Sequence, residues 1–232
     1  MNEVRKVRMA LMGPQRQATP ATAAQARGRY FNSANAFNIR LPDVPAHSFA
    51  GEAARAMAPG TPTGFVDCDQ SAALGSERPA TTPLMLARYA RIAAGEALAA
   101  RSNASGTIGY VIRGAGHTNI GPLDAGPAAE PSGERIDWSA GDVIFFPGGA
   151  QAVHHAVGDD AVLWLVNDEP LMDFGDLGAA AVPSGQAVHY PAAEIRHQLA
   201  QLYDAEPEPT TSGRALIFRA TRSSTRTTST LS

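Results

Sequence analysis

Short stretches of alternating apolar and polar residues recur through the middle of the chain. The stretch Leu84–Ile92 reads LMLARYARI and starts directly after Pro83. Alternation with a period of two is typical of a strand that buries one face. Similar short runs, separated by glycine-containing turns, cover Ile108–Ile112, His117–Ile120, Arg135–Trp138, Val143–Phe146, Val153–Val157 and Ala161–Val166. This spacing predicts an all-β fold, either an antiparallel barrel or a sandwich.

A helical pattern follows the strands. The segment Pro191–Tyr203 carries Ile195, Leu199 and Leu202 at the i, i+4, i+7 spacing of an amphipathic helix, and proline is favoured at a helix start. The sequence therefore divides into four predicted regions. These are an N-terminal arm over residues 1–28, an irregular β and loop region over 29–80 that packs on the barrel, the barrel over 81–172, and a C-terminal helix with an extended basic tail over 173–232.

Composition excludes several classes of partner. The 232 residues carry a net charge of −3, which gives no electrostatic basis for binding nucleic acid or a membrane surface. No stretch approaches the ~20 apolar residues of a membrane span. Cys68 is the only cysteine, so an internal disulfide is excluded and a cytoplasmic location is expected. Because exposed sheet edges need cover, we expect a homodimer or a higher homo-oligomer.

Spaced glycines frame the predicted strands. Gly95 and Gly114 enclose one set of positions, and Gly141, Pro147 and Gly149 lie at fixed intervals in a second set. These spacings resemble the two sequence motifs of the cupins. The resemblance implies a cupin barrel, a jelly-roll-like double-stranded β-helix, with an N-terminal arm and a C-terminal helix. We expect Gly114, Gly116 and Gly141 to be turn glycines with positive φ.

Longer runs point to one branch of the cupins. TTPLMLARYARIAAGEALA, GTIGYVIRGAGHT, ERIDWSAGDVIFFP and NDEPLM resemble gentisate 1,2-dioxygenases over about Thr81–Met172. The resemblance implies Fe(II), held by histidines inside a barrel, and cleavage of an aromatic ring next to a hydroxyl and a carboxylate. It also implies two barrels in one chain, and the run GRALIFRATRSSTRTTSTLS resembles the lead-in to a second barrel.

The positions that hold the metal in the cupin motifs carry other residues here. Arg101 and Asn103 stand at two histidine positions, Thr107 at the glutamate position and Ala152 at the third histidine position. A guanidinium at a cation site would cost on the order of several kcal/mol through Coulomb repulsion. We therefore predict no metal at the usual site and no cofactor.

Two histidines lie just beyond the third ligand position. His154 has the strand parity of Ala152, so a two-residue extension of the preceding loop would point it into the barrel, and His155 would then face outward. One interpretation makes His154 a ligand, with His155 or His117, in an unusual Fe(II) site. The other makes it a hydrogen-bonded core histidine.

Six residues are candidates to line a ligand pocket. Arg101 and Asn103 would pair with an anionic ligand, since a guanidinium matches the geometry of a carboxylate; alternatively, both lie at an exposed barrel mouth. Trp164 also fits a core position, as does Trp138. The pocket candidates are Arg101, Asn103, Thr107, Tyr110, His154 and Trp164.

Three functions fit this sequence. The first is a cupin without the three-histidine iron site that binds a small aromatic or carboxylate-bearing molecule. The second is an Fe(II)-dependent aromatic ring-cleaving dioxygenase, an oxidoreductase, with an unusual metal site. The third is a structural half of a two-barrel protein that acts as a homo-oligomer. Whether the chain is an enzyme stays open at this point.

Overall fold

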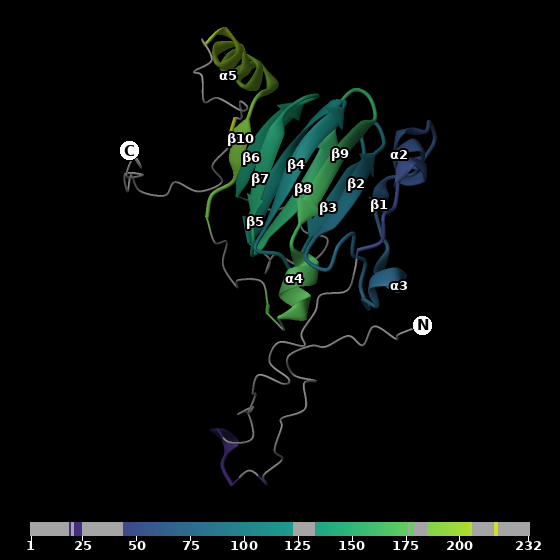
Figure 1. The fold of residues 1–232 in the computed structure, drawn as a ribbon. Helices are drawn as coiled ribbons and strands as arrows, with labels where there is room; N and C mark the ends of the chain where they lie inside the picture. The colour runs from purple at the N-terminus through teal and green to yellow at the C-terminus, as the bar shows by residue number, and fades with distance from the viewer. Residues whose placement is uncertain are drawn as a thin grey trace.

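A computed structural model describes residues 19, 21–24, 44–122, 133–175, 177–178, 185–205 and 216–217. The predicted arm over residues 1–28 and the predicted basic tail lie for the most part outside the described residues. The strands and helices of the remainder are arranged as in Figure 1. No described helix combines the length and the apolar character that crossing a membrane would require.

Strands form where the sequence alternates. They are β1 (Gly64–Asp67), β2 (Leu86–Ile92), β3 (Ala97–Arg101), β4 (Gly106–Arg113), β5 (Ala115–Pro122), β6 (Glu134–Ser139), β7 (Val143–Pro147), β8 (Ala150–Ala156), β9 (Ala161–Asn167) and β10 (Val188–Tyr190). The helices are α2 (Ala50–Met57), α3 (Ser71–Leu74), α4 (Glu169–Phe174) and α5 (Ala192–Asp204). Helix α5 begins directly after Pro191, as the sequence predicts.

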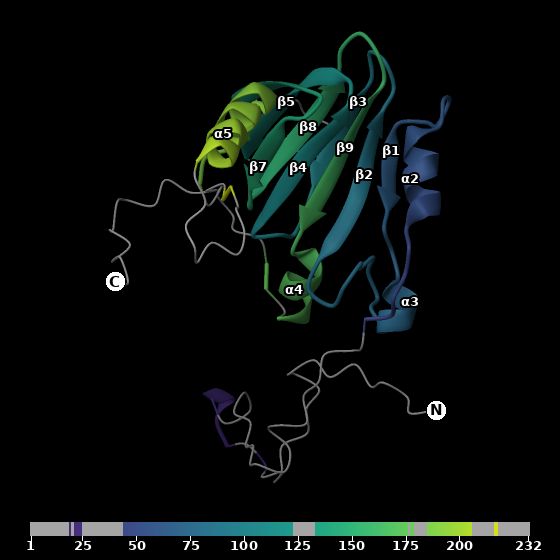
Figure 2. The ribbon, with the colours of Figure 1, turned by 45° about the horizontal axis from the view of Figure 1, so that its top comes forward.

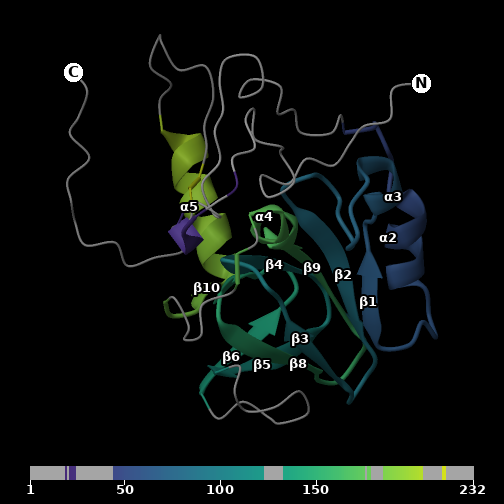
Figure 3. The ribbon, with the colours of Figure 1, turned by 90° about the horizontal axis from the view of Figure 1, so that it is seen from below.

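Within the described residues, the strands form two antiparallel sheets. The larger sheet has the order β1-β2-β9-β4-β7-β10, and the smaller has the order β3-β8-β5-β6. Pairing is nested, because β2 pairs with β9, β3 with β8, β4 with β7 and β5 with β6. A long antiparallel ribbon wound into two facing sheets gives this nesting, which is the topology of a jelly roll. Figure 3 shows the two sheets facing each other across the interior.

The strand predictions are confirmed, and the structure extends them. β3 joins the smaller sheet although the sequence marks it only by the metal-ligand positions of the first motif. β1 and β10 lie on the edges of the larger sheet, outside the predicted barrel range of 81–172. The larger sheet therefore draws one strand from each of the two flanking regions.

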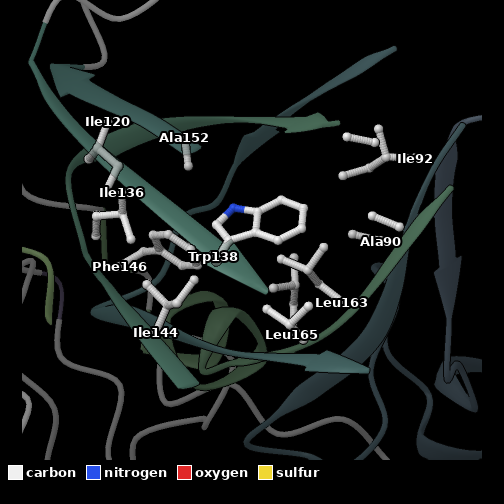
Figure 4. Close-up of a cluster of buried hydrophobic side chains, with 13 residues drawn as sticks. Ala90, Ile92, Ile120, Ile136, Trp138, Ile144, Phe146, Ala152, Leu163 and Leu165 are labelled. Atoms are coloured by element: carbon white, nitrogen blue, oxygen red, sulfur yellow. The ribbon is translucent and has the colours of Figure 1, made fainter. Parts of the chain in front are cut away.

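The core lies between the two sheets. Apolar side chains from both inner faces interdigitate there, with the indole of Trp138 among them (Figure 4). Trp138 is 3% exposed, as its predicted core position requires. The buried members of the core are Ala90, Ile92, Val111, Ile120, Ile136, Trp138, Ile144, Phe146, Ala152, Ala156, Ala161, Leu163 and Leu165.

The glycine predictions are confirmed at two positions and wrong at a third. Gly114 and Gly141 have φ of 85° and 94°, a region that L-residues with a side chain rarely adopt. Gly116 lies inside β5 and does not have a positive φ. A Cβ at this position would lie 1.9 Å from the carbonyl oxygen of His155. Gly116 is therefore needed for the close approach of β8, and not for a turn.

Candidate functional site

His154 is a buried polar side chain inside the barrel. It lies on β8 with the parity of Ala152, and both residues face the interior. Its side chain is 1% exposed. The predicted inward orientation of His154 is thus confirmed. The loop before β8 does not need to be two residues longer, because Ala152 already faces inward. His155 faces the other side, as predicted.

Thr118 connects His154 to Trp138. The hydroxyl of Thr118, on β5, lies 2.8 Å from Nδ1 of His154 and accepts a hydrogen bond of 2.8 Å from Nε1 of Trp138. The hydroxyl has one hydrogen to donate, and a neutral imidazole nitrogen can accept it. We therefore assign the hydroxyl as donor to Nδ1, which leaves the imidazole proton on Nε2.

The environment of His154 favours its neutral form. Burial lowers the pKa of the imidazole to about 4, and the charge of neighbouring His155 acts in the same direction. The ring of Phe146 packs edge-on against the imidazole at a centroid distance of 5.3 Å. At neutral pH His154 is thus an uncharged group that can offer one N–H at the cavity surface.

A small cavity opens beside His154 at one end of the barrel. Its volume is about 30 Å³, room for on the order of two water molecules. Among the described residues that line it, the charged side chains are Arg88 and Arg101, both cationic. The lining residues are Phe65, Arg88, Ala100, Arg101, Ser102, Thr107, Phe146, Pro147, Ala150, Ala152, His154, Leu165 and Asn167.

Arg88 is held in place from two sides. Its Nε lies 2.9 Å from a carboxylate oxygen of Asp67 on β1, although the geometry does not fit a hydrogen bond. Its guanidinium also stacks over the ring of Phe65, 4.8 Å from the ring centre. Arg88 occupies an inward position of β2, since Ala90 and Ile92 at the same parity belong to the core. In the sequence, Arg88 is a charged residue within an otherwise apolar strand, and this pattern could have identified it as a site residue.

Of the first three pocket candidates, Arg101 and Thr107 line the cavity, whereas Asn103 is not among the lining residues. Nε of Arg101 donates to the side-chain oxygen of Gln151 at 3.0 Å. The backbone N–H of Asn103 donates to Glu169 at 2.9 Å, and its side-chain amide donates to the carbonyl of Leu177 at 3.0 Å. Asn103 thus ties the turn after β3 to α4 and the segment that follows it. This is a structural role and corrects its assignment to the pocket.

The parity of β3 explains this difference. Leu98 and Ala100 face the core, so the next inward residue is Ser102. Arg101 has the outward parity and is exposed at the end of β3, so it contributes to the lining only at the mouth of the cavity. The inward residues Ala100 and Ser102 each lie one position before the predicted histidine positions, Arg101 and Asn103. Ala100 and Ser102 both line the cavity, together with Asn167 of β9. No pattern in the sequence indicates that Ser102 or Asn167 lies at this site.

Tyr110 and Trp164 do not line the cavity, which corrects two further predictions. Thr107, Gly109 and Val111 take the inward positions of β4, so Tyr110 points outward with 43% of its surface exposed. Trp164 pairs with Tyr110 in register on β9 and is 42% exposed, so it is not a core residue either. The cause is again strand parity, because one residue decides which face of the sheet a side chain occupies.

The cavity does not fit a three-histidine iron site. Within the described part of the chain, His154 is the sole imidazole among the lining residues, and no group of three histidine, cysteine, aspartate or glutamate side chains could hold a metal. His155 lies on the outer face of its sheet, where its ring stacks on His117 at 4.5 Å with an interplanar angle of 6°. His155 and His117 are therefore on the opposite side of β8 from His154 and cannot join it around one ion.

No protein-family model matches the sequence, and no curated protein matches it. Solved structures do match. Salicylate 1,2-dioxygenase from Pseudaminobacter salicylatoxidans is 19% identical over 57% of this chain and 31% of its own chain, with a TM-score of 0.39. A variant of that enzyme in complex with gentisate is 16% identical over 62% and 36%, with a TM-score of 0.43.

KdgF from Halomonas sp. is 21% identical over 39% of this chain and 74% of its own, with a TM-score of 0.31. The chain matches about a third of the length of the dioxygenases. These similarities are too low to assign chemistry, and the fold assignment rests on the nested strand pairing. That pairing makes the chain an all-β protein with a C-terminal helix and the jelly-roll topology that cupins have, in agreement with the fold class predicted from the sequence.

Proposed function

We propose that this cupin barrel binds the carboxylate of a small organic acid, without a metal, in the cavity beside His154. One observation carries the proposal. The charged side chains that line the cavity, in the described part of the chain, are Arg88 and Arg101, and His154 adds a neutral N–H donor. A lining of donors with positive charge is complementary to an anion and repels a cation.

The size of the cavity limits what can enter. A volume of about 30 Å³ accommodates a planar carboxylate group and leaves no room for an aromatic ring. The body of the ligand therefore stays outside this volume, and the lining residues Phe65, Pro147 and Ala150 are available for apolar contact. A small aromatic acid, with one carboxylate and a flat apolar body, meets both requirements.

Binding of salicylate, measured by isothermal titration calorimetry, tests the proposal. Salicylamide is the matched uncharged ligand, since it keeps the ring and the hydroxyl and lacks the negative charge. We expect salicylate to bind and salicylamide to bind at least ten-fold more weakly, because a guanidinium bonds more strongly to a charged oxygen. Equal affinity for the two ligands would refute a carboxylate site.

Two variants locate the site. Arg101→Gln removes one cation and should weaken salicylate binding by about ten-fold, on the order of 1.4 kcal/mol. Arg113→Gln removes an exposed arginine whose guanidinium bonds to the carbonyl of Met57, away from the cavity, and should leave binding unchanged. The same loss in both variants would indicate a general charge effect and would contradict the assignment to this cavity.

The ring-cleaving alternative is supported by the inward orientation of His154, a residue type that holds iron in many oxygenases. Elemental analysis of the purified protein and oxygen uptake with gentisate separate the two functions. Stoichiometric iron that is lost in His154→Ala, with oxygen uptake, would favour the dioxygenase. Salicylate binding without iron or oxygen uptake would favour the binding protein.

A further inference from the structure

The outer face of the larger sheet carries two apolar rows that run across five strands. Cα pairing in register defines each row, since paired residues of antiparallel strands lie on the same face. One row is Tyr89, Trp164, Tyr110, Val143 and Tyr190, and the other is Ala87, Val166, Ile108, Phe145 and Val188. Neither row contains a charged side chain. We call these ten residues the apolar face.

The centre of this face is exposed in the described part of the chain, while the residues around it are partly or fully buried. Helix α2 packs beside β1 and β2, where Ala56, Val66 and Val162 form a small cluster against Tyr89. Figure 2 shows β7, β4, β9, β2 and β1 side by side, with α2 next to β1. Helix α5 buries only Ala192. At the centre of the face, Ile108 is 54% exposed, and Tyr110 and Trp164 are 43% and 42% exposed.

We propose that the apolar face is the dimer interface of this protein and that a second copy of the chain covers it. Soluble proteins rarely expose a continuous apolar surface of more than a few hundred Å². Five strands about 4.8 Å apart and two rows about 7 Å apart give a face of roughly 24 by 14 Å. With side-chain relief, this is on the order of 500 Å² of accessible surface.

Two copies that meet through this face bury about 1,000 Å² in total, at the lower limit for a specific interface. The chemistry of the face also selects the partner. Two sheets can pack face to face at a distance of about 10 Å. In a dimer with a two-fold axis, the same apolar face of each copy contacts that of the other copy. The uncharged rows offer nothing to a strongly charged partner or to an anionic membrane. A second copy therefore fits this surface best.

Sedimentation velocity of the full chain over the micromolar range tests the dimer. We expect the mass to rise from one chain to two as concentration increases, with a blue shift in Trp164 emission. The signal of Trp164 is the part of the spectrum that is absent in Trp164→Phe, since Trp138 is the other tryptophan. Ile108→Lys should weaken association at least ten-fold, whereas Val157→Lys, an equally exposed position outside the face, should not.

Trp164→Arg provides a second disruptive variant if Ile108→Lys fails to fold. Three results would overturn the proposal. One is a single chain at every concentration, and another is a dimer that persists in Ile108→Lys and Trp164→Arg. The third is a blue-shifted Trp164 signal that does not depend on concentration in the single chain, because the face would then be covered by another segment of the same chain.

Discussion

The hydroxyl of Thr118 should be one of the strongest single polar contributions to the stability of the barrel. Thr118→Val keeps the shape of the side chain and removes the group that joins Trp138 Nε1 and His154 Nδ1. Both partners are almost completely buried, so neither can turn to water. A buried polar group left without a partner costs about 1–3 kcal/mol. The variant should therefore lose about 2–5 kcal/mol of the free energy of unfolding.

Urea unfolding followed by far-UV circular dichroism measures this loss. Thr107→Val is the matched control, since its hydroxyl lies 3.4 Å from that of Ser102 at the cavity rim, where water can replace it. The control should change stability by less than about 1 kcal/mol. The double variant Thr118→Val/Trp138→Phe should lose less than the sum of the two single variants, because the indole N–H no longer needs a partner. A Thr118→Val protein within about 0.5 kcal/mol of the unchanged chain would refute the reasoning.

Three further predictions concern particular residues. The pKa of His154 falls from 6.5 in the unfolded chain to about 4 in the fold, so the unfolded state binds the proton first as pH falls. Stability should therefore drop by about 2 kcal/mol between pH 7 and pH 5, and urea unfolding of His154→Gln at both values should show that this part of the drop is absent. Asp142 accepts hydrogen bonds from the backbone N–H groups of Ser139 and Ala192 and lies 2.9 Å from Nε2 of His189. Asp142→Ala should lose about 2–4 kcal/mol and increase hydrogen exchange in α5, while the exposed Asp159→Ala should do neither. Gly116→Ala should lower stability by about 3 kcal/mol, since its Cβ would collide with β8 and with Trp138. Gly64→Ala has open space and is its control in a thermal melt, so an equal loss in both would contradict the steric argument.

The strands could be predicted because their signal is local. Alternation and turn glycines act over a few residues, and the positive φ of Gly114 and Gly141 follows from that same short range. The order of the strands in the two sheets is not local. It was available only through the resemblance to the cupin motifs, which carries the nested pairing with it.

The candidate site could be predicted only in part. The prediction was right where the alternation of inward and outward residues along a strand could be counted from the sequence, and wrong where it could not. Counting along β8 correctly placed His154 inward and His155 outward, because the strand is regular over both residues. The same counting failed on β3, where the assignment was displaced by one residue and selected Arg101 and Asn103 in place of Ala100 and Ser102. Tyr110 and Trp164 failed for a related reason, since an aromatic on a strand is compatible with either face until the register is known.

The sequence by itself determined the strands, the turn glycines, the helix after Pro191 and the absence of histidine from the usual ligand positions. Each of these depends on residues that are neighbours in the chain. Only the tertiary structure decided that Thr118 joins Trp138 to His154 and that Arg88 and Arg101 line the same cavity. It also placed Tyr110 beside Trp164 on the outer face. These contacts join strands that are distant in sequence, and the pairing of the two sheets sets the distances between them.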